Sequence, residues 1–162
     1  MQTLGIPDTD TKALACQNIS VYLDGSGDAT ITASDLDNGS TDNCGTVTFT
    51  ASQTVFDCSD LGANSITLTG TDANTNSATC ASTITIIDTI RPIPNVASLP
   101  TLTAECALTA IAPTATDNCG GLVVINNDYV FPTNLDECQN GSFSVTFTAT
   151  DVCGNPAMAT AN

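Results

Sequence analysis

The feature that most constrains this chain is an internal repeat. The pentapeptide Thr-Asp-Asn-Cys-Gly occurs at residues 41–45 and returns at residues 116–120. Two further landmarks return in the same order, Asp10-Thr11 as Asp88-Thr89 and the Thr-x-Thr-Asp motif ending at Asp72 as the one ending at Asp151. A fixed period of about 75 to 79 residues indicates one small domain that is used twice.

The landmarks also define the domain boundaries. We expect residues 1–9 to be a linker or residues added at a cloning boundary, 10–88 to form the first repeat and 89–162 the second. Pro92 and Pro94 stiffen the connection and end the last strand of the first repeat. The second repeat stops at Asn162, where the first continues through 81–87, so we expect its last strand to be truncated and the chain to be an excised piece of a longer polypeptide.

The secondary-structure signal is all β. Short runs rich in Val, Ile, Thr and Phe alternate apolar with small polar residues and are bounded by Gly, Asn, Asp or Pro. These runs are residues 19–23, 29–32, 46–50, 65–71, 82–87, 122–125 and 142–148. Short strands at this density predict two tandem immunoglobulin-like β-sandwich domains.

Cysteine usage predicts that the domains are stapled by disulfides. The eight cysteines fall four to a repeat, with no histidine and no Cys-x-x-Cys pair, which favours disulfides in an oxidising compartment over zinc. We therefore expect an extracellular or cell-surface location. No membrane span is evident in the sequence, so we expect no membrane insertion.

The pairing can be predicted in part. If the first and last strands run side by side from one pole, Cys16 and Cys80 lie at similar depth, which leaves Cys44 with Cys58. In the second repeat the closest equivalent is Cys106 with Cys153 and Cys119 with Cys138. The pairing of Cys106 with Cys119 and of Cys138 with Cys153 stays open, because sequence does not fix connectivity.

Charge excludes several classes of partner. Seventeen carboxylates face two basic residues, a formal net charge of -15, which excludes sequence-independent binding to nucleic acid or to anionic lipid. So dense a negative charge repels itself unless cations bind, and solvated carboxylates that keep the protein soluble are the simpler interpretation for most single Asp residues.

One acidic segment has the spacing of a calcium loop. In residues 24–35, oxygen side chains stand at loop positions 1, 3, 5, 9 and 12. These are Asp24, Ser26, Asp28, Thr32 and Asp35. The alternative is a hairpin turned by Asp24-Gly-Ser-Gly, an insertion at residues 17–35 that the second repeat lacks.

A second candidate calcium site follows from the expected topology. One pole of such a sandwich gathers the start of the first strand and two interstrand loops. That pole would hold Asp10, Asp42 and Asp72 in the first repeat and Asp88, Asp117 and Asp151 in the second. Converging carboxylates with nearby carbonyls fit a calcium shell. The alternative is that Asp42 and Asp117 cap turns through local N–H bonds.

Several motifs together carry a resemblance to a known family. Asp-Thr-Ile-Arg-Pro at residues 88–92, Ala-Thr-Asp-Asn-Cys-Gly at 115–120, Phe131-Pro132 and the run at 145–155 resemble the hyalin-repeat (HYR) family of immunoglobulin-like modules. Residues 16–25, 29–32 and 35–40 resemble the variant in surface adhesins of Bacteroidota, including gliding-motility adhesins exported by type IX secretion. The resemblance covers residues 10–162 and implies adhesion and display rather than catalysis.

We therefore expect a structural repeat segment of a secreted or cell-surface bacterial adhesin or extracellular fibre, stiffened by calcium and displaying a distal binding region. Its expected partners are neighbouring repeats of the same polypeptide, other copies in a filament, and a surface or glycan receptor. We expect no enzyme, since histidine and phosphate-binding or nucleophile motifs are absent from the sequence. The alternative is a carbohydrate-binding accessory module of a secreted enzyme, which the shortage of aromatic residues disfavours.

Overall fold

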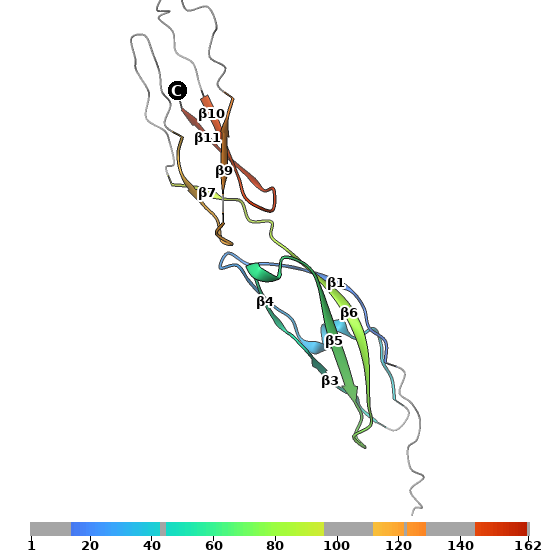
Figure 1. Cartoon of the computed structure of the whole chain (residues 1–162). Coiled ribbons are helices and arrows are strands. Elements are labelled where there is room, and N and C mark those ends of the chain that lie inside the picture. Colours follow the sequence, from blue (N-terminus) through green and yellow to red (C-terminus); the bar gives the residue numbers. More distant parts are fainter. Residues whose placement is uncertain (1–13, 43–44, 96–111, 122, 129–144, 162) are drawn as a thin grey trace, which may run out of the picture. The chain divides into compact units, whose positions relative to one another are not determined.

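The computed structural model describes residues 14–42, 45–95, 112–121, 123–128 and 145–161. It divides into two compact units, Met1–Asp88 and Thr89–Asn162. Within the described residues, regular structure consists of β-strands and two short 3-10 helices, as Figure 1 shows. The predicted all-β fold is therefore confirmed, and no helix in the described part of the chain is long and apolar enough to cross a membrane.

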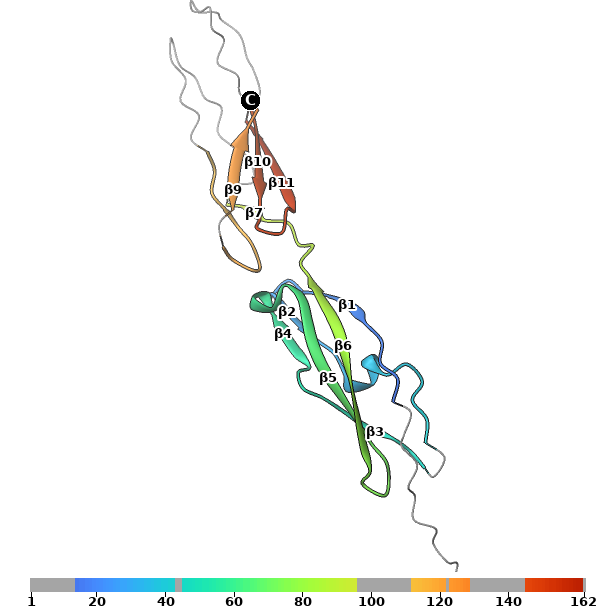
Figure 2. The same ribbon diagram turned by 45° about the vertical axis from the view of Figure 1, so that its right-hand side comes forward.

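The larger sheet of the first unit has the strand order β1-β6-β5-β3. Its strands are β1 (Ile19–Tyr22), β6 (Ser77–Ile87), β5 (Gly62–Thr71) and β3 (Thr48–Ala51). The long β5 and β6 form an antiparallel hairpin, whereas β1 runs parallel to β6. The first and last strands of the unit therefore lie side by side (Figure 2).

A smaller sheet pairs β2 (Asp28–Thr30) with β4 (Val55–Asp57). Each of these strands is followed in the sequence by a short 3-10 helix, β2 by η1 (Ala33–Leu36) and β4 by η2 (Cys58–Asp60). Because β1 and β2 belong to different sheets, the chain changes sheet at the turn between them. The two-stranded hairpin predicted for residues 17–35 is therefore wrong, although its turn is present.

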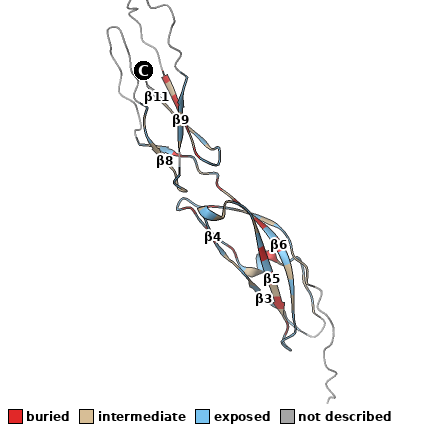
Figure 3. Cartoon of the chain, in the orientation of Figure 1, coloured by how far each residue is buried: buried red, intermediate tan, exposed pale blue. Residues whose placement is uncertain are grey.

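The core of the first unit follows from the alternation of side chains along β5 and β6. Ile66 and Leu68 of β5 and Ile84 and Ile86 of β6 are buried, while the residues between them are more exposed. Figure 3 colours the ribbon by burial, with buried residues in red. Phe56 of β4 is fully buried as well, so the small sheet contributes to the interior. Each such side chain contributes about 1.5–3 kcal/mol when it is fully removed from water.

The second unit contains a sheet with the order β11-β10-β9 and a separate strand pair. Its strands are β7 (Ile93–Pro94), β8 (Ala115–Thr116), β9 (Val124–Asn127), β10 (Val145–Thr150) and β11 (Pro156–Ala161). Alternate residues of β10, namely Val145, Phe147 and Ala149, are buried. β10 is therefore the core strand among the described residues of this unit.

The seven predicted runs all contain strand in the structure, with shifted ends. β6 begins at Ser77, five residues before the predicted start at Ser82. Four strands were not predicted as runs: β4, β11 and the two-residue strands β7 and β8. β4 is only three residues long, and half of the residues of β11 are alanine, which carries a weak strand signal.

Candidate functional site

Asp24 fixes the turn at which the chain passes from β1 to β2. Its Oδ1 accepts hydrogen bonds from the backbone N–H groups of Ser26 (2.8 Å) and Asp28 (3.1 Å). Its own N–H donates to the carbonyl of Asp28, and the N–H of Gly27 donates to the carbonyl of Asp24, both at 2.9 Å. The hydrogen bonds from the backbone of Asp28 and then of Ser26 hold the pKa of Asp24 below its ordinary value. The Asp24 carboxylate thus stabilises the turn that Asp24 itself begins.

The other predicted ligands of this segment lie on different elements. Asp28 begins β2, whose backbone pairs with β4. Asp35 caps η1, because its Oδ2 accepts from the N–H (2.7 Å) and the hydroxyl (2.9 Å) of Thr32. These two bonds, the backbone one first, lower the pKa of Asp35.

The carboxylates of Asp24, Asp28 and Asp35 do not form a group whose ligand atoms all lie within 4.8 Å of one another. Calcium binding by Asp24, Ser26, Asp28, Thr32 and Asp35 stays a prediction, but their three carboxylates are not gathered at one point. The physical reason is that β2 is an extended strand within the segment, where a 12-residue loop would have to curl around one ion. The turn interpretation describes Asp24 correctly.

Asp72 anchors the turn of the β5–β6 hairpin in the same way. Its Oδ1 accepts from the backbone N–H of Asn74 and of Asn76, both at 2.8 Å, and its Oδ2 accepts from the side-chain amide of Asn76 at 2.9 Å. The backbone N–H of Asp72 donates to the carbonyl of Asn76 at 3.0 Å. Asp72 is 8% exposed, so this is a buried anion held by local donors.

Asp151 repeats this arrangement between β10 and β11 of the second unit. Its Oδ1 accepts from the backbone N–H of Asn155 (2.8 Å) and its Oδ2 from the Asn155 side chain (2.9 Å). The N–H of Gly154 donates to the Asp151 carbonyl at 3.2 Å. Asp151 is also buried. The structure therefore uses one device in both repeats, an Asp that binds the residue four positions later across a three-residue loop.

The fourth residue of each turn has a positive φ. These residues are Gly27 (84°), Thr75 (71°) and Gly154 (89°). Glycine adopts this left-handed conformation at little cost, whereas a β-branched threonine is strained there. Asp24, Asp72 and Asp151, three predicted calcium ligands, are turn anchors in the structure, and the last two stand in β-hairpins.

The remaining predicted ligands are placed only in part. Asp10 lies outside the described residues, and Asp42 is half-buried next to residues 43–44, which lie outside them as well. Asp88 is buried at the end of the first unit. The convergence of Asp10, Asp42 and Asp72, and that of Asp88, Asp117 and Asp151, stays a prediction.

Asp117 caps a turn in the second unit, as the alternative interpretation expected. Its Oδ2 accepts from the N–H of Cys119, and its carbonyl accepts from the N–H of Gly120, both at 3.1 Å. Its Oδ1 is buried and accepts no hydrogen bond among the residues that the structure describes. This oxygen has unused capacity for a donor or a cation.

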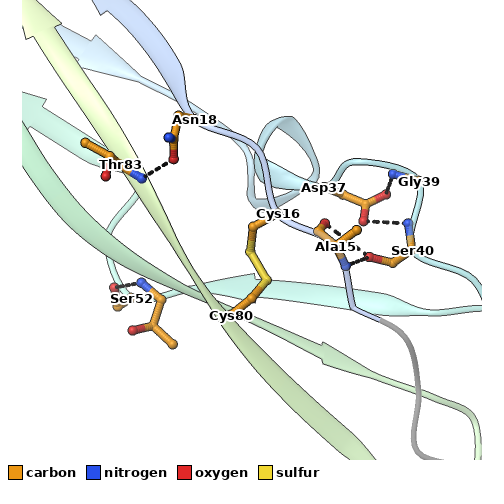
Figure 4. Close-up of a disulfide and its surroundings, with 10 residues drawn as sticks. Ala15, Cys16, Asn18, Asp37, Gly39, Ser40, Ser52, Cys80 and Thr83 are labelled. Atoms are coloured by element: carbon orange, nitrogen blue, oxygen red, sulfur yellow. Dashed lines mark hydrogen bonds between the residues drawn. A yellow bond between two sulfur atoms is a disulfide. The ribbon is translucent and has the colours of Figure 1, made fainter.

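A disulfide joins the first strand region to the last strand of the first unit. Cys16 and Cys80 are bonded with a Cα–Cα distance of 6.1 Å across a sequence separation of 64, which confirms the predicted pair (Figure 4). Beside it, Asn18 Oδ1 accepts from the N–H of Thr83 at 2.7 Å. Closure of so long a loop stabilises a domain by about 2–4 kcal/mol, mainly by restricting the unfolded chain.

The other cysteines correct one part of the prediction. Cys58 and Cys119 are also in disulfides, and their predicted partners Cys44 and Cys138 lie outside the described residues. Cys153 has an exposed thiol, so the predicted bond between Cys106 and Cys153 is wrong. The same thiol excludes the alternative bond between Cys138 and Cys153. The reason is local, since Cys153 occupies the β10–β11 turn rather than a strand facing another sheet.

Comparison with known proteins gives likeness of fold at low identity. No protein-family model matches the sequence, so the resemblance to hyalin repeats stays a prediction. The chain is similar to Drosophila N-cadherin EC1-4 at 14% identity and a TM-score of 0.43, over 94% of this chain and 48% of that one. It is similar to human protocadherin-24 EC1-2 at 14% identity and a TM-score of 0.37, over 88% of this chain and 92% of that one. The chain thus spans about half of the N-cadherin structure.

Proposed function

We propose that this chain is a structural repeat segment of a secreted or cell-surface bacterial adhesin or extracellular fibre. In this role the two units hold a distal binding region away from its anchor and perform no catalysis. The observation that carries the proposal is the covalent and hydrogen-bonded connection between the first and last strand regions of the first unit. Cys16 and Cys80 are covalently bonded beside a backbone ladder between β1 and β6.

The disulfides support an extracellular location. Such bonds persist in oxidising compartments and are rare where cellular thiols keep cysteines reduced. Cys16, Cys58, Cys80 and Cys119 are all oxidised in the structure. A unit of at most 88 residues has a small hydrophobic core and gains much of its stability from such bonds.

The outward face of the larger sheet is polar and nearly free of aromatic side chains. Thr50, Thr69 and Thr79 stand in one cross-strand row, and Thr48, Thr71 and Ser77 stand in the next. Tyr22 is the one aromatic among the exposed large hydrophobic residues of the described chain. A sugar-binding platform relies on aromatic faces, so this surface favours a structural role over the carbohydrate-binding alternative.

The carboxylates of the described residues are suited to holding turns rather than to moving protons. Asp24, Asp35 and Asp57 accept local hydrogen bonds that lower their pKa values. General acid and base catalysis near neutral pH needs groups whose pKa lies near the working pH. This supports a function without catalysis.

Exposed strand edges supply a route to the proposed partners. β3 and β1 are the outer strands of the larger sheet within the described residues. Outer strands offer backbone groups that pair with another chain. Neighbouring repeats, further copies in a filament and a surface or glycan receptor are the proposed partners.

Calcium stiffening remains part of the proposal in a narrower form. The carboxylates of Asp24, Asp35 and Asp72 accept local hydrogen bonds, whereas the buried Oδ1 of Asp117 accepts none among the described residues and could serve as one ligand of a calcium shell. We expect calcium to raise the melting temperature of the oxidised chain relative to a chelator at fixed ionic strength. Equal melting curves would remove calcium from the proposal and leave the disulfides as its staples.

Surface display is tested on intact cells of the source organism. An antibody raised against the folded 162-residue chain should label unpermeabilised cells or their extracellular fibres, and external protease should remove the signal. A cytosolic protein labelled in parallel should stain only after permeabilisation. Labelling of this chain only after permeabilisation would contradict the proposed function.

A further inference from the structure

The chain enters and leaves the first unit on two strands that lie side by side. β1 pairs with β6 in parallel, from Ile19 opposite Ile84 to Tyr22 opposite Ile87. The ladder is extended at one end by the bond from Leu23 N–H to the Ile87 carbonyl (3.0 Å) and at the other by the bond from Thr83 N–H to Asn18 Oδ1 (2.7 Å).

This parallel arrangement determines the direction of a load on the unit. The chain enters at the amino end of β1 and leaves at the carboxyl end of β6, which are opposite ends of the pair. Tension between the two ends therefore acts along the strands. In a unit without the disulfide, the hydrogen bonds of the ladder would be loaded together in shear rather than opened one after another.

The disulfide lies on the same path, ahead of the ladder. Cys16 precedes β1 by three residues, and Cys80 lies within β6, four residues before Ile84 (Figure 4). Tension that arrives at Cys16 crosses the sulfur–sulfur bond to Cys80 and continues along β6 to Asp88. Residues 17–79 are outside this covalent path.

The path has almost no slack. Cys80 and Asp88 are eight residues apart, and most of that segment is already a strand with a rise of about 3.3 Å per residue. A fully extended chain spans at most about 3.3–3.6 Å per residue, so only a few ångströms can be gained. Without the bond, the 72 residues from Cys16 to Asp88 could lengthen by on the order of 200 Å.

We propose that the Cys16–Cys80 disulfide makes the first unit a force-transmitting link of fixed length, in which residues 17–79 carry no tension. The mechanical property stands on the topology alone, and its biological use rests on the proposed function as an extracellular stalk. Loss of the β1–β6 ladder under load does not lengthen such a unit, because the covalent path stays closed.

The second unit provides an internal reference. Ala159 occupies the position eight residues after Asp151, as Cys80 does after Asp72. β11 contains no cysteine. Its exit strand therefore has no equivalent cross-link, and the second unit should lengthen in a step when it unfolds under tension.

The test is single-molecule stretching of the oxidised 162-residue chain between handles at its two ends. The oxidised chain should show the step of the second unit only. The double variant Cys16→Ser/Cys80→Ser should add a step on the order of 200 Å, shorter by any loop that the Cys58 disulfide closes. Cys58→Ser is the matched control, because Cys58 lies outside the path and its removal should add no step.

A second measurement does not depend on the folding of a variant. Oxidised wild-type chain is held at constant force and exposed to dithiothreitol, which transfers two electrons and two protons to the bond and becomes a cyclic disulfide. A further step on the order of 200 Å should appear, sooner at higher force, because this bond carries the load, in addition to any extension from reduction of the Cys119 disulfide.

An added step of this size in the oxidised wild-type chain without reductant would overturn the proposal. An equal step in the Cys58→Ser control, or a waiting time independent of force, would overturn it as well. The stretching experiment tests the fixed length of the first unit, and the antibody experiment tests the location of the protein. A unit of fixed length in a protein found inside cells would therefore contradict the proposed function and leave the mechanical inference standing.

Discussion

Removal of the Asp72 carboxylate should destabilise the first unit strongly. Asp72→Ala deletes two hydrogen bonds from the backbone of Asn74 and Asn76 and one from the Asn76 side chain. Hydrogen bonds to a charged acceptor contribute about 1.5–3 kcal/mol each. Asn74 and Asn76 are exposed, so in the variant their N–H groups can bond to water instead. The loss is therefore set by the two backbone hydrogen bonds alone, each at the lower end of this range.

The free energy of unfolding should therefore fall by about 3 kcal/mol, twice the lower value per bond. For a unit of this size each kcal/mol shifts the melting temperature by about 4–8 °C, which gives a decrease of about 12–24 °C. Asp72→Asn keeps one oxygen for the two backbone donors and should lose about half as much. Asn74→Ala, a matched change in the same turn that spares the Asp72 acceptor, should stay within about 0.5 kcal/mol.

Differential scanning calorimetry of the oxidised chain, with chelator and then with calcium, measures these changes for the transition of the first unit. Equal effects of Asp72→Ala and Asn74→Ala would refute the role of the carboxylate as a hairpin anchor. A loss seen with calcium but absent with chelator would instead assign Asp72 to a metal site.

Three further changes test other features of the described structure. Thr75→Gly should stabilise the first unit by about 0.5–1 kcal/mol, because it relieves a β-branched residue at φ 71°. Gly154→Ala should destabilise the second unit by about 1 kcal/mol, because φ is also positive there. Destabilisation by the first change or stabilisation by the second, measured by urea unfolding, would contradict this. Ser82→Ala should stabilise the first unit by about 1 kcal/mol, because the 2%-exposed hydroxyl has no hydrogen-bond partner among the described residues. Ser52→Ala should destabilise it by about 1 kcal/mol, because it removes the acceptor of the Thr67 N–H. A lower free energy of unfolding in the Ser82 variant would show that the hydroxyl has a partner. The melting temperature should stay constant between pH 7 and about 5 and decrease below about pH 4. Asp24, Asp35 and Asp57 have folded-state pKa values below their unfolded ones, so their contribution to stability is lost as the pH falls through the folded values. The triple variant with Asn at these positions should show a smaller decrease, and an unchanged decrease would contradict the assignment.

The sequence predicted the all-β fold well because the alternation along β5 and β6 is long and regular. It also predicted the Cys16–Cys80 bond, since the two cysteines lie at similar distances from Asp10 and Asp72 and the first and last strands are in fact neighbours. The cysteine prediction already assumed that these two strands run in the same direction, but the register of β1 on β6 was beyond prediction, because the pattern of one strand does not specify its pairing with a neighbour.

The calcium-loop prediction depends on strand pairing of the same kind. Spacing along residues 24–35 matches an ion-binding loop, but whether the backbone curls or extends depends on pairing of β2 with the distant β4. The Asp anchors, in contrast, carried a readable signal. Asp72 and Asp151 are each followed four residues later by Asn, with a turn between them. The Cys153 prediction placed a disulfide at a position that aligns with Asn74, and both residues lie in turns between two strands.

Our central claim is that the first unit is an extracellular module closed by the Cys16–Cys80 bond. Its most direct test is disulfide mapping of the protein collected from its natural source. Thiols are first blocked, and the unreduced chain is then cleaved on the amino side of aspartate, which places Cys16 in residues 10–23 and Cys80 in residues 72–87.

Mass spectrometry should recover these two peptides as one cross-linked species from the extracellular or cell-surface fraction. The same digest places Cys119 in residues 117–127 and so also identifies its partner. Recovery of Cys16 and Cys80 as separately blocked thiols in freshly collected protein would contradict both the oxidising location and the covalent path.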